Sequence, residues 1–224
     1  MFNKGLFSKE PQNQKWVKKN IDGFNMNLNP YDGGISGALY AQGYREKAFM
    51  GILQNTVTEG MTCLDLGGNI GYTTLYMCRG AGSSGKVYAV EPDPNSIGLL
   101  RANIVDNGYS EMCEVTQCAI TDEDKLLEFW QADKPNLSSV HQTKHSTEKI
   151  EVEAYTLETF FKNRDFPNFI KMDVEGHEVS IFHGGLNYFA NNTSESTSIL
   201  LEVHPHFYSD DNNFEAILKD YFEI

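Results

Sequence analysis

Long apolar runs are missing from this sequence of 224 residues, and none approaches the ~18–20 residues that a membrane-spanning helix needs. The first seven residues lack the long apolar core of a secretory signal peptide. Cysteine is scarce as well: there are four, with no Cys-x-x-Cys spacing. They are typical of small core residues rather than of a disulfide framework or a zinc site. We therefore expect a cytoplasmic protein with reduced thiols and no membrane span.

Positive charge is also in short supply. Lys and Arg total 18 against 31 Asp and Glu, which gives a formal net charge of −13. Such acidity repels phosphate backbones, so we do not expect nucleic-acid binding. Residues 1–20 are the exception, with five lysines and one glutamate. We interpret this basic stretch as a solvated arm or a lead-in helix.

The chain has no Pro-rich linker, internal repeat or low-complexity tract, and its length suits one ordinary domain. Its apolar content of 40% suffices for a hydrophobic core. We assign residues 1–57 to a lead-in that ends in a helix over 44–57 and belongs to the same domain. Residues 58–224 form the main part of that domain. Nothing in the sequence sets an oligomeric state.

Short apolar segments alternate with segments of helical periodicity along the main part. Strands are expected at 61–66, 87–90, 114–120, 169–173 and 198–203, and helices at 72–79, 94–107 and 175–190. Asp93 is a good N-cap residue, followed by Pro94 at the first helical position. This alternation predicts an α/β fold with a mostly parallel sheet and helices on both faces.

Residues 125–155 interrupt this rhythm. Segments 126–130 and 150–154 alternate between apolar and polar residues, as half-exposed strands do. We interpret them as an antiparallel insertion, after which Thr156 caps a short helix. Near the end of the sequence, residues 213–222 look helical and 222–224 are consistent with the start of a sixth strand.

Acidic residues end four of the predicted strands: Asp65, Glu91, Asp173 and Glu202, the last followed by His204. The carboxyl ends of parallel strands form the ligand-binding edge of an open sheet. Each carboxylate there costs desolvation energy unless something compensates it. A polyhydroxylated or cationic ligand would do so.

The glycine loop after the first strand distinguishes two kinds of nucleotide ligand. A dinucleotide fingerprint Gly-x-Gly-x-x-Gly starting at Gly67 fails at Asn69 and at Tyr72. The pattern Asp65-x-Gly67-x-Asn69-x-Gly71 instead suits a ligand without phosphates whose amino-acid part lies against loop amides. Glu91 is placed to accept both hydroxyls of a ribose. An adenosine that carries an amino acid is S-adenosylmethionine.

Three segments make the sequence resemble the FkbM family of S-adenosylmethionine-dependent methyltransferases, with Leu201-Glu202-Val203-His204-Pro205 extending the match. They are Asp65-Leu66-Gly67-Gly68-Asn69-Ile70-Gly71-Tyr72, Tyr88-Ala89-Val90-Glu91-Pro92-Asp93-Pro94 and Phe169-Ile170-Lys171-Met172-Asp173-Val174-Glu175-Gly176-His177-Glu178. The resemblance covers roughly residues 40–205 and implies the class I methyltransferase fold. In that fold a hairpin of strands six and seven normally closes the sheet, and here little sequence remains to supply it. Gly68 also departs from the alanine more usual in the family.

The resemblance implies a set of cofactor-binding residues: Asp65, Gly67, Asn69 and Gly71 on the methionine side, Glu91 at the ribose, Cys118 and Ala119 at the adenine, and also Tyr72 and Pro92. For Cys118 and Ala119, plain core packing is an equal alternative. Lys171 has a purely structural alternative, an ion pair with Glu175 or Glu178. We interpret His177 as a packing or surface residue.

The groups expected to converge on the acceptor are Asp173, Glu175, Glu202 and His204. In one scheme His204 is the general base, oriented by a carboxylate. In the other a divalent metal on Asp173, Glu202 and His204 lowers the pKa of a bound hydroxyl. The metal requirement stays open at this point.

The resemblance implies an O-methyltransferase that acts on a hydroxyl of a small acceptor, a saccharide or glycosylated natural product. The polar segment 131–149 would form part of the acceptor wall. Two alternatives remain: a nicotinamide-dependent oxidoreductase, which the failed fingerprint opposes, and a non-catalytic nucleoside-binding module, which the intact acidic residues oppose.

Overall fold

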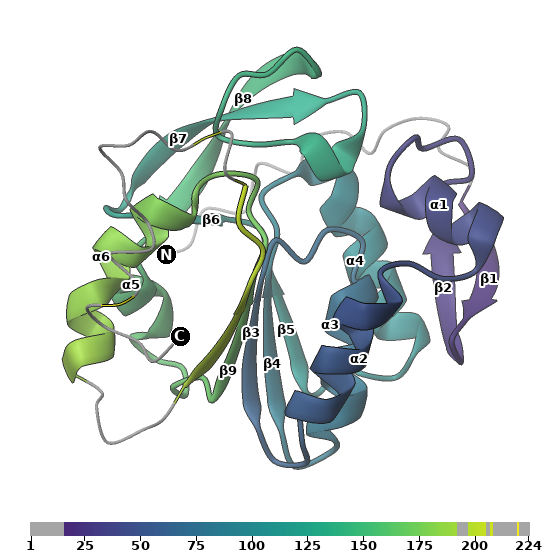
Figure 1. The fold of residues 1–224 in the computed structure, drawn as a ribbon, viewed down its shortest axis with the longest axis horizontal. Helices are drawn as coiled ribbons and strands as arrows, with labels where there is room; N and C mark the ends of the chain where they lie inside the picture. The colour runs from purple at the N-terminus through teal and green to yellow at the C-terminus, as the bar shows by residue number, and fades with distance from the viewer. Residues whose placement is uncertain (1–15, 192–196, 205–206, 208–218, 220–224) are drawn as a thin grey trace, which may run out of the picture.

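The centre of the fold is a parallel sheet with strand order β10-β9-β3-β4-β5 (Figure 1). The computed structural model describes residues 16–191, 197–204, 207 and 219. The strands are β3 (Thr62–Leu66), β4 (Lys86–Val90), β5 (Cys113–Thr116), β9 (Phe169–Met172) and β10 (Ser198–Leu201). All four neighbouring pairs are parallel, as the near-continuous apolar segments predict.

Helices cover both faces of this sheet, because successive strand side chains point to opposite faces and both sets are apolar. One face carries α2 (Lys47–Thr56), α3 (Tyr72–Ala81) and α4 (Pro94–Asp106); the other carries α5 (Leu157–Phe161) and α6 (Glu178–Asn191) (Figure 1). Along β3, for example, Cys63 belongs to the core under α3 and α4, whereas Leu64 belongs to the core under α5 and α6. The predicted helices are confirmed, with ends shifted by a few residues.

The N-terminal segment corrects a prediction. From residue 17 the chain forms a hairpin of β1 (Val17–Ile21) and β2 (Phe24–Leu28), followed by α1 (Ile35–Gln42). It is neither an arm nor a lead-in helix there; residues 1–15 lie outside the described residues. The turn is Asp22-Gly23, and both residues have positive φ, 52° and 90°. Asp-Gly between alternating residues is a recognised hairpin signal, which the count of lysines obscured.

The hairpin packs on α3 and α4. Asp22 Oδ2 accepts hydrogen bonds from the hydroxyls of Tyr72 and Tyr76 at 2.8 and 2.6 Å. The amide nitrogen of Asn27 donates to Asn103 Oδ1 on α4 at 2.6 Å. The apolar side chains of β2 share one buried cluster with both helices. This supports the assignment of the N-terminal segment to the same domain, which stays a prediction.

The segment 114–120, expected to be one strand, forms two strands in different sheets. β5 ends at Thr116, and after a break β6 (Ala119–Ile120) pairs in parallel with β8 (Ser146–Tyr155). Cys118 is fully buried at the crossing point, which lets the chain move between sheets without exposing an apolar side chain. Apolar periodicity cannot reveal such a break, because it does not indicate which strand each half pairs with.

The expected antiparallel insertion is confirmed. β7 (Lys125–Ala132) pairs antiparallel with β8, and a short 3₁₀ turn, η1 (Pro135–Leu137), follows β7. In Figure 1 this second sheet lies above the central sheet. The helix expected at 213–222, the strand at 222–224 and any closing hairpin lie outside the described residues.

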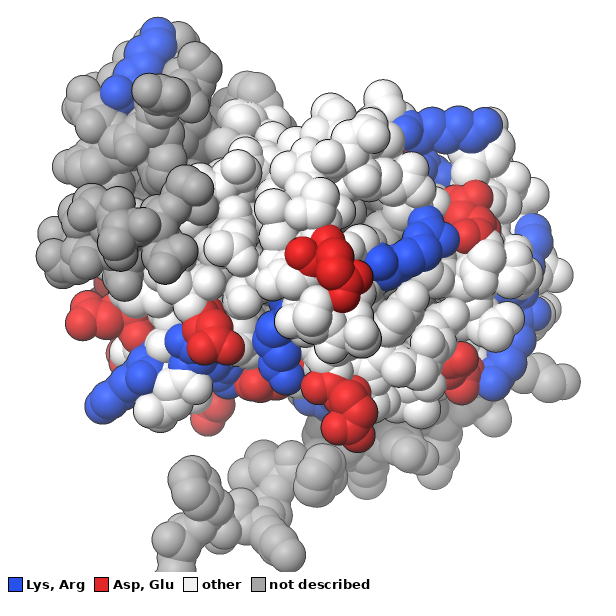
Figure 2. Space-filling model, turned by 90° about the horizontal axis from the view of Figure 1, so that it is seen from below, with Lys and Arg blue, Asp and Glu red and all other residues white. Residues whose placement is uncertain are grey.

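On the face seen in Figure 2, acidic and basic side chains are interspersed between wide areas of other residues. Among the described residues, no helix is both long and apolar enough to cross a bilayer.

Candidate functional site

A cavity opens at the carboxyl ends of β3, β4, β9 and β10, under the second sheet. The space inside it and at its open mouth, open solvent included, is about 1130 Å³. Most of the predicted site residues line it: Gly67, Asn69, Tyr72, Glu91, Pro92, Cys118, Ala119, Asp173, Glu175 and Glu202. Asp65, Gly71 and His204 do not belong to its lining.

The glycine loop after β3 fits tightly against β9 and α4. Gly67 has a φ of 78°, and a Cβ there would overlap the carbonyl oxygen of Asp173. Gly71 has a φ of 90°, and a Cβ there would lie 2.7 Å from Leu100 Cδ1. Only glycine meets both conditions, a left-handed backbone and no side chain. The loop therefore places its backbone at the cavity and directly beside Asp173.

Asp65 supports this loop from behind, which corrects its predicted contact with the ligand. Its side chain is fully buried, and Oδ2 accepts hydrogen bonds from the hydroxyls of Thr73 and Thr74 at 2.9 and 2.6 Å. Both threonines lie in the first turn of α3, just after the loop. Asp65 thus fixes the end of β3 to the start of α3 and sets the shape of the loop between them.

Lys171 on β9 is a buried amine inside the site, not the exposed partner of Glu175 or Glu178 that the sequence suggested. Its Nζ donates to the carbonyl oxygen of Gly67 at 2.8 Å and lies 3.3 Å from Asp65 Oδ1. Burial alone would lower the pKa of Lys171, but Asp65 and Asp173 raise it, so the amine stays charged. Lys171 is the register partner of Asp65 on adjacent strands, a pairing that only the strand order reveals.

Glu91 is held at the end of β4 by two backbone amides. Oε2 accepts from the amide of Asn69 and Oε1 from the amide of Asp93, both at 2.8 Å. Burial, reinforced by the nearby charge of Asp93, raises the pKa of Glu91 to about 8. Each carboxylate oxygen has a second lone pair, so Glu91 can still accept one hydroxyl on each oxygen. This geometry suits the two adjacent hydroxyls of a ribose.

Asp93 ties the second sheet to the cofactor side of the cavity, a role the sequence did not reveal. It caps α4 as predicted, with Oδ1 accepting from the amide of Asn95 at 2.9 Å. Oδ1 also accepts from Gln131 Nε2 at 3.0 Å, and Oδ2 accepts from Ser138 Oγ at 2.8 Å. The neighbouring Ser139 donates to the carbonyl oxygen of Glu175 at 2.7 Å. The segment after β7 thus bridges both sides of the cavity.

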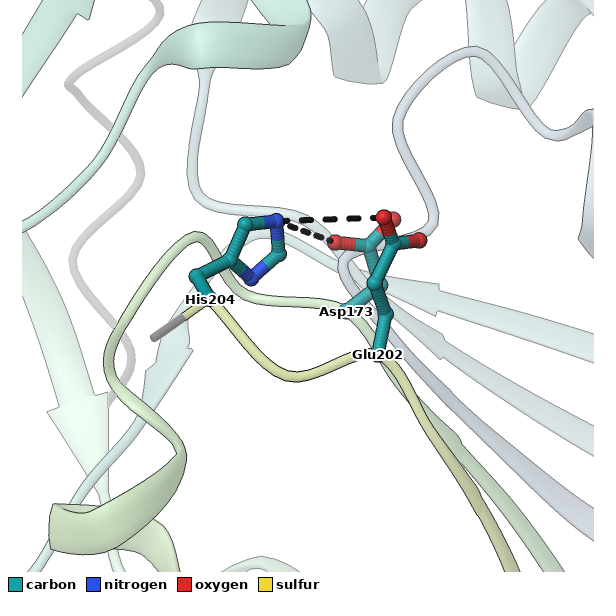
Figure 3. A group of neighbouring side chains, drawn as sticks. All are labelled: Asp173, Glu202 and His204. Carbon is teal, nitrogen blue, oxygen red and sulfur yellow. Dashed lines mark ion pairs between the residues drawn. The ribbon is translucent and has the colours of Figure 1, made fainter. Parts of the chain in front are cut away.

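The four predicted catalytic residues come together, and Figure 3 shows three of them: Asp173, Glu202 and His204. His204 Nε2 lies 3.5 Å from Glu175 Oε2, 3.9 Å from Asp173 Oδ1 and 4.0 Å from Glu202 Oε1. The other ring nitrogen, Nδ1, is 3.2 Å from Glu178 Oε1, whose side chain is fully buried. The ends of β9 and β10 bring these groups together, since the two strands are neighbours in the sheet.

The charges in this cluster are strongly coupled. The hydrogen bond with Glu178 raises the pKa of His204 to about 9, and Glu175 and Asp173 add to it. Burial raises the pKa of Glu175 to about 7 and also raises that of Glu202. His204 is therefore protonated at neutral pH in this structure. An imidazolium cannot accept a proton, so this geometry does not favour the scheme in which His204 is the base.

His177 is largely buried, as a packing residue would be, and it also lines the cavity. Its side chain is buried, Nε2 lies 2.9 Å from Thr121 Oγ1, and burial lowers its pKa to about 4. Cys118 and Ala119 pack in the core and also line the cavity, and their contact with the adenine stays a prediction.

Comparison with known proteins identifies the family. The model of the methyltransferase FkbM domain matches residues 65–222, which is more than half of the chain and contains the glycine loop, Glu91 and the β9 and β10 residues. The chain belongs to the FkbM methyltransferase family. The family is one of methyltransferase domains, which agrees with the predicted S-adenosylmethionine-dependent methyltransferase and not with the nicotinamide-dependent oxidoreductase.

Individual relatives are similar over parts of the chain. It is 44% identical over 59 residues to a protein-L-isoaspartate O-methyltransferase of Methanococcoides burtonii, covering 26% of this chain and 29% of the relative. It is 29% identical over 143 residues to methyltransferase 1 of Beauveria bassiana, covering 54% of this chain and 57% of the relative. The matches thus span less than two thirds of either relative.

The crystal structure of methyltransferase FkbM from Methylobacillus flagellatus has a similar fold. It matches with a TM-score of 0.50 and 17% identity, over 72% of this chain and 38% of the other. The predicted class I methyltransferase fold is confirmed for this FkbM protein.

Proposed function

We propose that this FkbM methyltransferase transfers a methyl group to a hydroxyl oxygen of a small acceptor, a saccharide or a glycosylated natural product. One observation carries the proposal: the carboxylates of Asp173, Glu175 and Glu202 line the same cavity as the glycine loop and Glu91. Carboxylates accept hydrogen bonds from hydroxyl groups, and several in one cavity suit an acceptor with several hydroxyls.

When bound, S-adenosylmethionine supplies an activated methyl group, so the protein must position an oxygen and help remove its proton. Glu91 holds the ribose hydroxyls and thereby fixes the cofactor along the loop. Asp173 follows β9 directly beside that loop, as the close approach of its backbone to Gly67 requires. We assign to Asp173 the hydrogen bond that orients the acceptor hydroxyl, with Glu175 and Glu202 binding its neighbours.

The segment between β7 and β8 forms the rest of the acceptor wall, through Pro135, Asn136, Ser138 and Val140. The net charge of −13 favours a small neutral or cationic acceptor over a nucleic acid. The four cysteines are buried and unpaired, which supports our proposal that the protein works in the reducing cytoplasm.

The proposal is tested by incubating the full chain with methyl-labelled S-adenosylmethionine and a panel of saccharides, glycosides, phenols, amines, isoaspartyl peptides and tRNA. We expect labelled products among the saccharides or glycosides, and we expect the label to survive alkali, because methyl ethers resist hydrolysis. Alkali-labile labelling of peptides would indicate methyl esters and overturn the proposal. So would transfer confined to amines or RNA.

A further inference from the structure

The orientation of the His204 ring is the one that metal-binding histidines adopt. Its Nδ1 lies against Glu178, a fully buried carboxylate at the start of α6, which fixes the plane of the ring. Nε2 is thereby turned toward the carboxylates of Asp173 and Glu202 (Figure 3) and lies 3.5 Å from Glu175 Oε2. Metal-binding histidines almost always use this arrangement, in which one ring nitrogen donates to a carboxylate and the other faces the ion.

The distances among Asp173, Glu202 and His204 suit binding to one shared ion better than direct hydrogen bonds between the three side chains. The distances of 3.9 and 4.0 Å from Nε2 to Asp173 Oδ1 and Glu202 Oε1 are too long for hydrogen bonds. One ligand atom from each residue lies within 4.8 Å of the others. Ligand atoms about 2.0–2.2 Å from one cation lie roughly 3–4 Å apart, so a small closure around an ion suffices.

Asp173 supplies a second, independent observation. Its Oδ1 is buried away from solvent and makes no hydrogen bond, which is costly for a carboxylate oxygen. This is the oxygen that faces His204 Nε2. A cation between them would satisfy it.

We propose that Asp173, Glu202 and His204 bind one divalent cation, of the Mn²⁺ type, at the acceptor side of the cavity. Two carboxylates and one imidazole suit such an ion, and the open cavity leaves positions for oxygens of the acceptor. The cation takes the place of the proton on Nε2. That the acceptor hydroxyl binds this ion, which would lower its pKa, rests on the proposed function; binding of the ion itself does not.

The test is a titration of the chelator-treated full chain with Mn²⁺, in which electron paramagnetic resonance measures the free ion. We expect one equivalent to bind to the wild type, and at least about tenfold weaker binding to E202Q and H204Q. Competition with Zn²⁺ and Mg²⁺ defines the preferred ion. E128Q is the matched control, because Glu128 lies on the exposed side of β7 paired with Lys149. Binding of S-adenosylhomocysteine by calorimetry checks that each variant is folded.

A wild type that binds none of the three ions overturns the inference, and so does unchanged Mn²⁺ affinity in E202Q and H204Q. These results are distinct from failure of the proposed function. Stoichiometric Mn²⁺ binding without methyl transfer to any hydroxyl would leave the cation site in place and remove the proposed acceptor. Hydroxyl methylation by a protein that binds no ion would do the reverse.

Discussion

The cofactor side and the acceptor side of the cavity differ in the groups that line them: backbone groups on the first, side chains on the second. On the cofactor side, the loop of residues 67–71 follows β3 and Glu91 follows β4. Backbone amides donate the hydrogen bonds that hold the Glu91 carboxylate. On the acceptor side, side chains from the ends of β9 and β10 face a wall supplied by the second sheet. The first side is formed mainly by backbone groups, which Lys171 of β9 helps to hold, whereas the second is formed mainly by side chains.

The two sides also differ in how their charges are balanced. Behind the glycine loop, Asp65 is neutralised by Lys171 and by two hydroxyls. On the acceptor side, Asp173, Glu175, Glu178 and Glu202 surround the single ring of His204. Unbalanced carboxylates in a cavity are costly, which is typical of functional sites rather than of structural ones. The difference predicts that substitutions on one side change mainly cofactor binding, and on the other mainly turnover.

The largest effect is expected for Asp173→Asn. The amide is nearly isosteric but cannot act as a carboxylate toward the acceptor, so methyl transfer should fall by at least about 100-fold. The affinity for S-adenosylhomocysteine should be nearly unchanged, because the loop geometry depends on the Asp173 backbone and not on its side chain. Label transfer and calorimetry measure the two quantities.

Glu128→Gln serves as the matched control for Asp173→Asn, since it removes an exposed carboxylate that does not line the cavity. Wild-type transfer rates in Asp173→Asn would remove the catalytic assignment. An equal loss of cofactor binding and turnover would show that the two sides are not separable.

A smaller effect is expected for Glu91→Gln, on the cofactor side. The amide cannot accept hydrogen bonds from two backbone amides and two hydroxyls at once, so affinity for S-adenosylhomocysteine should fall by about tenfold. The pKa of Glu91 is about 8, and ribose hydroxyls favour the charged carboxylate. Wild-type affinity should therefore rise with pH up to about 8 and then level off.

The variant provides its own control for the pH dependence, because glutamine does not titrate. Calorimetry from pH about 6.5 to about 9 should show the rise in the wild type and its absence in Glu91→Gln. The ribose assignment fails if the two profiles coincide.

The smallest effect is expected for Ser138→Ala in the wall. It removes the hydrogen bond to Asp93 and one from the amide of Ala132, which should lower the free energy of unfolding by about 1–2 kcal/mol. KM for the acceptor should rise severalfold while cofactor affinity stays close to wild type. Ser83→Ala, in an exposed turn, is the matched control. A change confined to cofactor affinity would show that Ser138 belongs to the cofactor side of the cavity and not to the acceptor side.

The sequence predicted best those features that depend on a single short segment of the chain. The N-cap at Asp93 and the glycine loop were correct because caps and tight turns depend on neighbouring residues. The Asp22-Gly23 hairpin was equally local and was available in the sequence, but it was missed. The division of 114–120 between two sheets has no local signal, since the partner of each half is a strand from another part of the chain.

The site followed the same rule. Asp65 and Lys171 are register partners only because β9 lies beside β3, although more than a hundred residues separate them along the chain. No single segment predicts that pairing, so Lys171 was assigned to the wrong carboxylates. The bridge from Asp93 to Ser138 likewise depends on how the second sheet docks.

The sequence by itself determined the alternation of strands and helices, the loop that approaches a nucleoside, and the acids at the strand ends, because these depend on local backbone preferences and on periodicity. Only the tertiary structure decided which acidic residue pairs with Lys171 and supports the loop from behind. It also decided that four carboxylates surround one histidine. Electrostatic interactions act through space, so they follow the strand order and the docking of the second sheet rather than the order of residues along the chain.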